Sequence, residues 1–340
     1  MKVKILAHGV DPDGIISHAL IERYYQSSTD VIEHCIEHQY VDYPDLAESL
    51  EQLSKVRNDR SKVYVADLNF NNDIIHFGGN ILRNIQENNS SLAWFDHHDS
   101  SIRNRKLLER FCFPLGLSSE DCASRIVANK LLGGVDEYAN SIAEIAQAHD
   151  FRIESGAFKL GEQLQDIIKF RTMSKKPNNE LDELVRLIAT EQAWNVNWKL
   201  DNDLSEEVML FQEMKKEAYQ EIFSNAEIHI IGEKKAVVAH TPSILYMKDG
   251  PFYLQKQFGC QVDYFISIFD DDKGSVVIFG KPGQVEDDLT LINYCGSRNG
   301  GGRVNMGGFY LGEQVTTESY QRIRNQTLES FQEVLERSND

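Results

Sequence analysis

Three consecutive residues, Asp96, His97 and His98, could do chemistry, because they follow directly on an apolar run at 92–95. We expect this run to be a buried strand that delivers one carboxylate and two imidazoles at its carboxyl end. Burying such groups costs free energy unless they gain partners. This combination of side chains therefore predicts a metal ion or an anionic ligand as the partner.

Three further segments in the same half of the chain could supply the remaining ligands. Their candidate residues are His8, Asp11 and Asp13 in a turn, Asp67 after an apolar run, and Asp150 after a helical pattern. Mixed imidazole and carboxylate ligands suit manganese, magnesium, iron or zinc rather than a thiolate site. One carboxylate can bridge two ions about 3.5–4 Å apart, and a hydroxide between them can attack phosphorus in line. The set predicts a two-metal phosphoesterase.

Each segment also has an ordinary structural explanation when it is taken alone. The first could be an Asx-rich turn, whereas a calcium loop is excluded because Ile15 stands where that loop needs an oxygen ligand. Asp67 could cap a helix, and Asp150 could be a solvated helix end. The metal-like sequence at 34–38 is expected to have a structural or surface role, because on a strand Cys35 would point away from the two histidines.

The spacing of apolar residues predicts alternating strands and helices in the first 150 residues. The expected strands are at 3–7, 31–37, 61–67 and 92–95, and the expected helices are at 14–25, 44–56, 72–86, 120–132 and 135–149. Gly78 and Gly79 are expected to interrupt or shorten the third helix. This alternation is typical of a parallel sheet with helices on both faces, whose ligands bind beyond the carboxyl ends of the strands.

The rest of the chain predicts a helical connector and a smaller α/β domain. The smaller domain should hold strands near 227–231, 235–239, 262–269 and 275–280 and helices near 251–258 and 287–295. The predicted boundaries are 1–158 for the first domain, 159–225 for the connector, 226–316 for the second domain and 317–340 for a C-terminal amphipathic helix.

The overall composition excludes several classes of protein. With 340 residues, 41% hydrophobic and 26% charged, the chain is expected to be globular with two domains. A formal net charge of -18 argues against an extended grip on duplex DNA, although local cations could still hold a small anion. Five scattered cysteines, no signal-peptide core and no run of about 20 apolar residues predict a cytoplasmic protein without a membrane partner.

The ordered motifs resemble those of the DHH phosphoesterase superfamily. They are His8-x-x-Asp11-x-Asp13-Gly14, Asp67-Leu68-x-x-Asn71, Asp96-His97-His98 and Asp150, followed by Gly300-Gly301-Gly302. The triplet alone would be a weak signal, but four motifs in order with a distal glycine-rich loop are specific. The superfamily includes single-strand exonucleases, nano-RNA hydrolases, cyclic-dinucleotide phosphodiesterases, exopolyphosphatases and manganese pyrophosphatases.

The resemblance implies a role for each matched residue. One divalent ion would be bound by His8, Asp11 and Asp67, and the other by Asp13, Asp67, His97 and Asp150, so that Asp67 bridges them. Manganese is the favoured ion, and magnesium is the alternative. The predicted catalytic residues are His98, facing the substrate phosphate or leaving oxygen, and Asp96 behind the ligands. The first domain would be catalytic, and the glycine-rich loop of the second would close on substrate across a cleft between them.

The sequence departs from the family pattern in its glycine-rich loop and in its first motif. Arg303 stands where the family usually has a histidine, so phosphate binding could survive while a proton-donating role would be lost. Two residues separate His8 from Asp11, whereas other subfamilies have one or three. Lys281 and Arg298 are further candidate substrate-binding residues, with a solvated surface position as the alternative for each.

Three functional hypotheses follow from these residues. The first is an enzyme, a manganese-dependent phosphodiesterase that hydrolyses short oligonucleotides to nucleoside monophosphates. The second keeps the fold and takes pyrophosphate, polyphosphate, a 3′-phosphonucleotide or a linear or cyclic dinucleotide. The third is a weakly active nucleotide sensor, motivated by Arg303. A homodimer is also open, because the C-terminal helix could pack on a partner chain.

Overall fold

The chain folds into two units, Met1–Phe211 and Gln212–Asp340, each with its own sheet and its own hydrophobic clusters. The structure is a computed structural model. It describes residues 2–27, 35–56, 60–70, 72–88, 91–195, 197–245, 249–259, 261–271, 274–281, 290–298, 300–303 and 305–337.

The first unit is built on a five-stranded parallel sheet in the order β2-β1-β3-β4-β5. Its strands are β1 (Lys2–His8), β2 (Cys35–Val41), β3 (Lys62–Ala66), β4 (Ser91–Asp96) and β5 (Leu115–Leu117). The central strands are almost continuously buried, as expected when helices cover both faces of a parallel sheet. The edge strand β2 alternates in exposure and extends to Val41, four residues beyond the predicted end. Residues 31–34 of that predicted strand lie outside the described residues.

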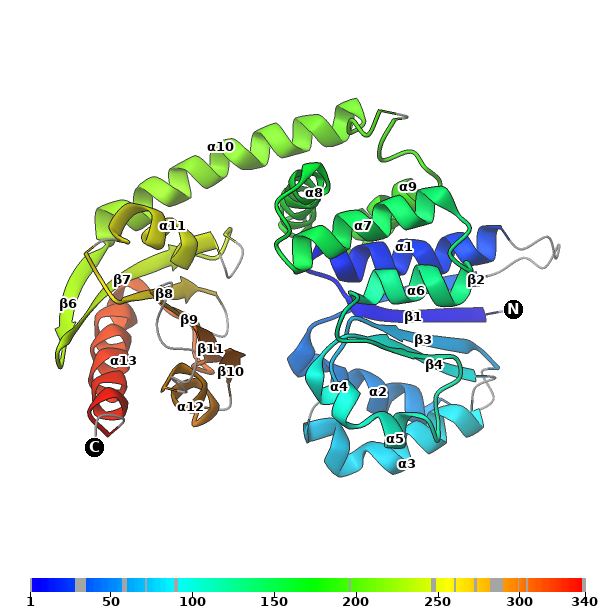
Figure 1. Cartoon of the computed structure of the whole chain (residues 1–340), viewed down its shortest axis with the longest axis horizontal. Helices are drawn as coiled ribbons and strands as arrows, with labels where there is room; N and C mark the ends of the chain where they lie inside the picture. The colour runs from blue at the N-terminus through cyan, green and yellow to red at the C-terminus, as the bar shows by residue number, and fades with distance from the viewer. Residues whose placement is uncertain are drawn as a thin grey trace. The chain divides into compact units, whose positions relative to one another are not determined.

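Helices cover both faces of this sheet, as predicted (Figure 1). They are α1 (Pro12–Gln26), the short 3-10 helix η1 (Tyr43–Asp45), α2 (Leu46–Lys55), α3 (Asn72–Asn88), α4 (Asp99–Arg103), α5 (Arg105–Leu108), α6 (Ala123–Leu131), α7 (Glu137–Asp150), α8 (Gly156–Thr172) and α9 (Pro177–Ala189). One cluster joins α1, α6, α7, α8 and α9 to one face, and the other joins α2 and α3 to the opposite face.

The predicted interruption of the third helix at Gly78 and Gly79 is wrong, because α3 is continuous from Asn72 to Asn88. The buried residues Ile74, Leu82 and Ile85 belong to one hydrophobic cluster and anchor both ends of the helix. A glycine inside a helix costs only about 1 kcal/mol, which this packing offsets.

The second unit has a six-stranded mixed sheet in the order β10-β11-β9-β8-β7-β6, parallel only between β7 and β8. Its strands are β6 (Glu227–Ile231), β7 (Lys234–Pro242), β8 (Tyr264–Asp270), β9 (Ser275–Gly280), β10 (Gly301–Arg303) and β11 (Met306–Tyr310). Its helices are α11 (Asp249–Phe258), α12 (Thr290–Gly296) and α13 (Thr317–Arg337). The boundary between the units falls within α10 (Asn202–Asn225).

The sheet of the second unit is also covered on both faces. Residues of α10 and α11 pack on one face, and residues of α12 and α13 pack on the other (Figure 1). The predicted class, a parallel α/β domain followed by a second α/β domain, is confirmed. Within the described residues, no helix combines the length and the apolar character needed to cross a bilayer.

Candidate metal centre

The register of the parallel sheet brings the predicted site residues to one edge. Ala7 pairs with Ala66, and Ala66 pairs with Phe95, so the three central strands end at the same level. The next residues along these strands are His8, Asp67 and Asp96. Their positions therefore follow from strand pairing alone, as expected for the carboxyl edge of a parallel sheet.

The first group of ligand atoms consists of His8, Asp11 and Asp67, all within 4.8 Å of one another. Nδ1 of His8 lies 3.0 Å from Oδ2 of Asp11 and 3.7 Å from Oδ2 of Asp67. The other oxygen of Asp11 accepts the N–H of Gly14 at 3.0 Å and caps α1. The turn therefore holds Asp11 in place and leaves one of its oxygens directed at the imidazole.

The second group consists of Asp67, Asp96, His97 and His98, and it shares Asp67 with the first. Nε2 of His97 lies 3.4 Å from Oδ1 of Asp67 and 3.8 Å from Oδ2 of Asp13. Nδ1 of the same ring lies 3.6 Å from Oδ2 of Asp150. The structure thus brings all six predicted metal ligands together, with His97 among three carboxylates.

Asp13 also has a structural role that we did not predict from the sequence. Its two oxygens accept the N–H groups of Ala123 and Ser124, each at 2.8 Å, at the start of α6. These hydrogen bonds join the first turn to a helix more than one hundred residues away and fix the buried carboxylate beside His97. A carboxylate oxygen has two acceptor sites, so a capped oxygen can still face a cation.

His98 lies in a hydrogen-bonded chain with Asp96. Its Nδ1 lies 2.7 Å from Oδ1 of Asp96, which is fully buried. Its Nε2 lies 3.2 Å from the hydroxyl of Tyr43. Asp96 therefore holds the imidazole that we predicted to face substrate, and Tyr43, which we did not predict, contacts its other nitrogen.

The electrostatics of the cluster favour a bound cation. Burial and the neighbouring carboxylates of Asp13 and Asp11 raise the pKa of Asp67 well above its usual value. Oδ2 of Asp67 and Oδ2 of Asp96 are buried without a hydrogen-bond partner among the described residues. Asp67 also has a positive φ of 53°, a conformation that is uncommon for residues other than glycine and that often occurs at functional sites.

The contact between His8 and Asp11 shifts their pKa values in opposite directions. Burial alone would lower the pKa of His8, but the charge and hydrogen bond of Asp11 raise it well above the usual value. The same contact holds the pKa of Asp11 below its usual range despite burial. Without an ion, the contact with Asp11 therefore favours the protonated, positively charged form of His8.

These residues fit a pair of divalent cations. The fit rests on two groups of donors that share one carboxylate, and on two buried carboxylate oxygens that have no hydrogen-bond partner among the described residues. Imidazole and carboxylate donors are compatible with manganese, zinc or iron, and with magnesium if most ligands are oxygens. The donor set supports a hard or borderline divalent ion without selecting one.

Sequence reasoning missed Asp42, Tyr43 and Gln165. Asp42 follows β2, and its Oδ1 lies 3.7 Å from Nε2 of His8. Gln165 is buried on α8 and donates a hydrogen bond of 2.8 Å to the carbonyl of Val10 in the first motif. The strand-end position of Asp42 was a usable signal, but the predicted second strand ended too early to show it.

The predicted substrate-binding residues lie in the second unit. Gly300, Gly301 and Gly302 lead into the β10–β11 hairpin, where Gly301 pairs with Gly308. A Cβ on Gly300 would lie 2.1 Å from the carbonyl oxygen of Gly308, so packing requires this glycine, whereas a Cβ on Gly301 would meet no atom within 4 Å. Packing therefore accounts for the glycine at 300 but not for the glycine at 301.

Three of the predicted substrate-binding residues in this unit are cationic: Lys281, Arg298 and Arg303. The guanidinium carbon of Arg298 lies 3.9 Å from the ring centroid of Tyr294. The backbone N–H of Lys281 donates to the carbonyl of Asp263 at 2.8 Å. The side chain of Arg303 lies outside the described residues. The roles of these three residues therefore stay a prediction.

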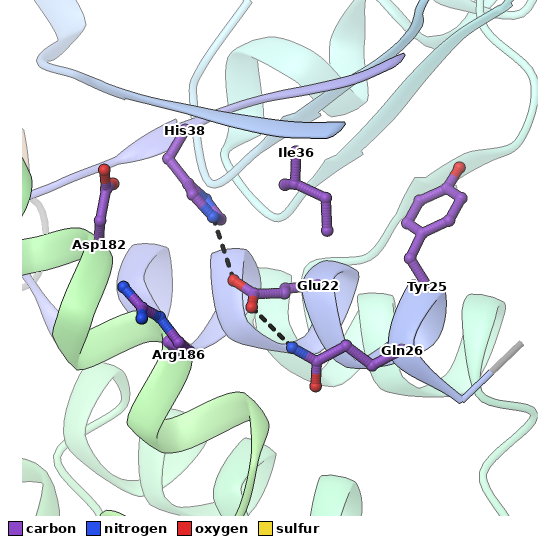
Figure 2. Close-up of a pocket in the computed structure, with 7 residues that line it drawn as sticks. All are labelled: Glu22, Tyr25, Gln26, Ile36, His38, Asp182 and Arg186. Carbon is purple, nitrogen blue, oxygen red and sulfur yellow. Dashed lines mark hydrogen bonds and ion pairs between the residues drawn. The ribbon is translucent and has the colours of Figure 1, made fainter. Parts of the chain in front are cut away.

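A separate pocket of about 450 Å³ lies between α1, β2 and α9 (Figure 2). Its lining residues are Glu22, Tyr25, Gln26, Ile36, His38, Asp182 and Arg186. Glu22 accepts a hydrogen bond from Gln26 at 2.7 Å and lies 3.1 Å from Nε2 of His38. His38 also lies 3.1 Å from Nδ1 of His18, so it ties β2 to α1, consistent with the structural role that we expected for it.

Gly14→Ala is expected to destabilise the protein by about 2–4 kcal/mol, the range of severe steric substitutions. A Cβ on Gly14 would lie 1.9 Å from the carbonyl oxygen of His8, so the first turn would have to open. The measurement is the free energy of unfolding by urea. Gly79→Ala in α3 is the matched control, because a Cβ there meets no atom within 4 Å, and it should be neutral or stabilising. Equal stability of the two variants would contradict this packing.

The fold and the site define a class: a two-unit α/β protein with a candidate two-metal centre at the carboxyl edge of a parallel sheet. No family model and no curated protein matches the chain. Among solved structures, a pGpG-specific phosphodiesterase, PggH, from Vibrio cholerae matches 97% of this chain and 99% of its own, at 12% identity and a TM-score of 0.52. An exopolyphosphatase-related protein from Bacteroides fragilis matches 98% of this chain and 93% of its own, at 13% identity and a TM-score of 0.51.

The chain shares the fold of these two proteins over nearly its full length. The resemblance inferred from the ordered motifs is therefore confirmed at the level of the fold.

Proposed function

We propose that this chain is a divalent-metal-dependent hydrolase of phosphoric esters. The observation that supports this most strongly is Asp67, a buried carboxylate that belongs to two groups of metal-ligand atoms. One of its oxygens has no hydrogen-bond partner in the part of the chain that the structure describes. Similarity of fold to a phosphodiesterase and to an exopolyphosphatase-related protein adds support. A structural cluster of acids would not need two imidazoles and a shared carboxylate at one sheet edge.

The proposed ligands of the first ion are those of the first group, and the proposed ligands of the second ion are His97 and the three carboxylates beside it. One ion would be held by His8, Asp11 and Asp67, and the other by Asp13, Asp67, His97 and Asp150. When bound, such ions supply an activated water and offset the charge of the phosphate. Asp96 would hold the ring of His98, which in turn would contact the phosphate or the leaving oxygen.

The proposed substrate is a short oligonucleotide, which is hydrolysed to nucleoside monophosphates with manganese. The net charge of -18 disfavours long duplex DNA, whose binding depends on many lysine and arginine contacts. Gly300, Gly301, Gly302 and Arg303, with Lys281 and Arg298, are the proposed substrate-binding residues. A cytoplasmic location and a homodimer complete the proposal. Polyphosphate is the second candidate, favoured by the similarity to the exopolyphosphatase-related protein.

A substrate panel tests this function. The chain is stripped with a chelator, reloaded with Mn²⁺ or Mg²⁺, and offered labelled di- to pentanucleotides, pGpG, pyrophosphate and polyphosphate. We expect release of nucleoside monophosphates at about 1 per second or faster, a typical enzyme rate. Turnover of the inorganic anions alone would replace the nucleotide substrate with the second candidate. Nucleotide-induced stabilisation without turnover of any member would contradict the enzyme hypothesis and favour a sensor.

A further inference from the structure

The turn that follows β2 places Tyr43 between two imidazoles that come from different strands. The ring centroid of Tyr43 lies 4.4 Å from that of His8 at an interplanar angle of 33°. It lies 5.4 Å from that of His98 at 74°, and its hydroxyl is 3.2 Å from Nε2 of the same ring. A single side chain therefore contacts a proposed metal ligand from β1 and the proposed substrate-facing histidine after β4.

Strand pairing and a local cap determine where Tyr43 lies. Val41, the last residue of β2, pairs with His8, so the next residues emerge beside that imidazole. Asp42 caps η1, and its Oδ1 accepts the N–H of Tyr43 at 2.8 Å. The ring is half-buried and packs on the cluster formed by α2, α3 and the sheet. The position of Tyr43 is thus fixed by backbone and packing rather than by the imidazoles that it contacts.

The contacts of His98 determine which of its nitrogens carries the proton in the neutral ring. Asp96 is fully buried, and a carboxylate accepts hydrogen bonds, so Nδ1–H of His98 donates to Oδ1 of Asp96 at 2.7 Å. Nε2 then has a lone pair, and in the absence of substrate it accepts a hydrogen bond from the hydroxyl of Tyr43. The ring is therefore held at both nitrogens, a device that fixes the tautomer and the orientation of a functional histidine.

We propose that Tyr43 is a positioning residue that orients His98 through its hydroxyl and supports His8 through its ring. This inference rests on the proposed function for the role of His98, but the hydrogen bond itself can be tested without turnover. The two contacts are separable, because Tyr43→Phe removes only the hydroxyl and Tyr43→Leu also removes the aromatic face. Partners that orient metal-binding histidines typically contribute about 10–100-fold to metal affinity or activity, and we expect an effect of the same order for His98.

A kinetic double-mutant cycle tests the hydroxyl on the best nucleotide from the substrate panel. Tyr43→Phe should lower kcat about 10–100-fold with less than about a twofold change in KM. In a His98→Ala background the same substitution should change kcat less than about twofold, because it acts only through the missing ring. Tyr138→Phe is the control, since its hydroxyl donates to the carbonyl of Ile188 away from the site, and it should leave kcat unchanged. An equal loss in both backgrounds would overturn the proposal.

A spectroscopic measurement keeps the test independent of catalysis. In the chain loaded with diamagnetic Mg²⁺, the imidazole nitrogens of His98 are assigned by comparison with His98→Gln in ¹⁵N-labelled protein. We expect the Nδ1–H tautomer in the wild type and a mixture of tautomers in Tyr43→Phe at the same pH. An unchanged tautomer in Tyr43→Phe would overturn the positioning role. A wild type with no turnover but a fixed tautomer would count against the proposed function and leave this inference supported.

The ring contact predicts a separate effect on metal binding. Tyr43→Leu should weaken Mn²⁺ binding by about 10-fold or more in titration calorimetry, because His8 loses the face against which it packs. Tyr43→Phe keeps that face and should bind Mn²⁺ as the wild type does. Equal Mn²⁺ affinities of the wild type, Tyr43→Phe and Tyr43→Leu would contradict the proposal that the ring of Tyr43 supports His8.

Discussion

Asp67→Asn is expected to abolish phosphoester hydrolysis, lowering kcat by about 10³-fold or more, while the metal-free protein becomes no less stable. Loss of a bridging ligand removes several kcal/mol of transition-state stabilisation, and each 1.36 kcal/mol corresponds to a factor of ten. Burial and nearby carboxylates raise the pKa of Asp67, so its charge opposes folding when no ion is bound. Asparagine removes that charge, and it tolerates the positive φ of 53°.

A loss of activity without a loss of metal-free stability distinguishes a metal ligand from an acid with only a structural role. The measurements are kcat on the best nucleotide substrate, the number of Mn²⁺ ions bound per chain, and the melting temperature after chelation. Asp203→Asn, an exposed acid in the first turn of α10, is the matched control and should change none of them. Full activity of Asp67→Asn, or a large fall in its metal-free melting temperature, would contradict the assignment of Asp67 as the shared ligand.

Strand order explains why His8, Asp67 and His97 could be grouped from the sequence, whereas the full set of six proposed metal ligands is what the family resemblance implies. Apolar runs that end in polar groups identify strand ends, and parallel strands present those ends at one edge. His8, Asp67 and His97 therefore needed no knowledge of side-chain packing to be grouped. Their individual roles stay a prediction, because proximity alone does not say which atom binds an ion.

Asp42 and Tyr43 could not be predicted in the same way. They follow β2, which lies at the edge of the sheet and alternates between exposed and half-buried residues. Such a strand has a weak apolar signal, and the predicted strand at 31–37 ended before Val41. An error of four residues at one strand end was enough to remove both side chains from the candidate site.

Contacts between segments far apart in the chain could not be predicted from the sequence either. Gln165 meets the carbonyl of Val10 across 155 residues, and Asp13 caps α6 across more than one hundred. An amphipathic pattern shows that a helix has a buried face, but it does not name the surface that covers it. The helical segment after residue 159 therefore carried no functional signal, although α8 and α9 pack in the same hydrophobic cluster as α1.

Mn²⁺ affinity is expected to rise with pH above 6.5, the ordinary pKa of histidine, by up to about tenfold per pH unit for each proton released. The hydrogen bond and charge of Asp11 outweigh burial and raise the pKa of His8, so this imidazole is protonated before the ion binds. Burial and two neighbouring carboxylates likewise raise the pKa of Asp67. A ligand must lose its proton to bind a metal, so binding and proton release are coupled.

The raised pKa values of His8 and Asp67 also determine whether the stability of the metal-free protein rises or falls with pH. A group whose pKa is raised by folding stabilises the protein at low pH, and that stability is lost as pH rises through the folded pKa. The melting temperature of the metal-free protein should therefore fall between pH 6.5 and pH 8.5. Over the same range, the increase in melting temperature on Mn²⁺ binding should become larger. Asp11, whose pKa is lowered, adds stability that is lost only in acid, outside this range.

Titration calorimetry in two buffers with different ionisation enthalpies counts the protons released on Mn²⁺ binding. We expect at least one proton at pH 6.5, and about one fewer in His8→Gln, which has no imidazole to deprotonate. His229→Gln removes a histidine from the second unit and should leave the count unchanged, because His229 lies beside Glu227 on β6. Affinity that does not vary with pH would mean that neither His8 nor Asp67 releases a proton when the ion binds, and it would contradict the raised pKa values of these two groups.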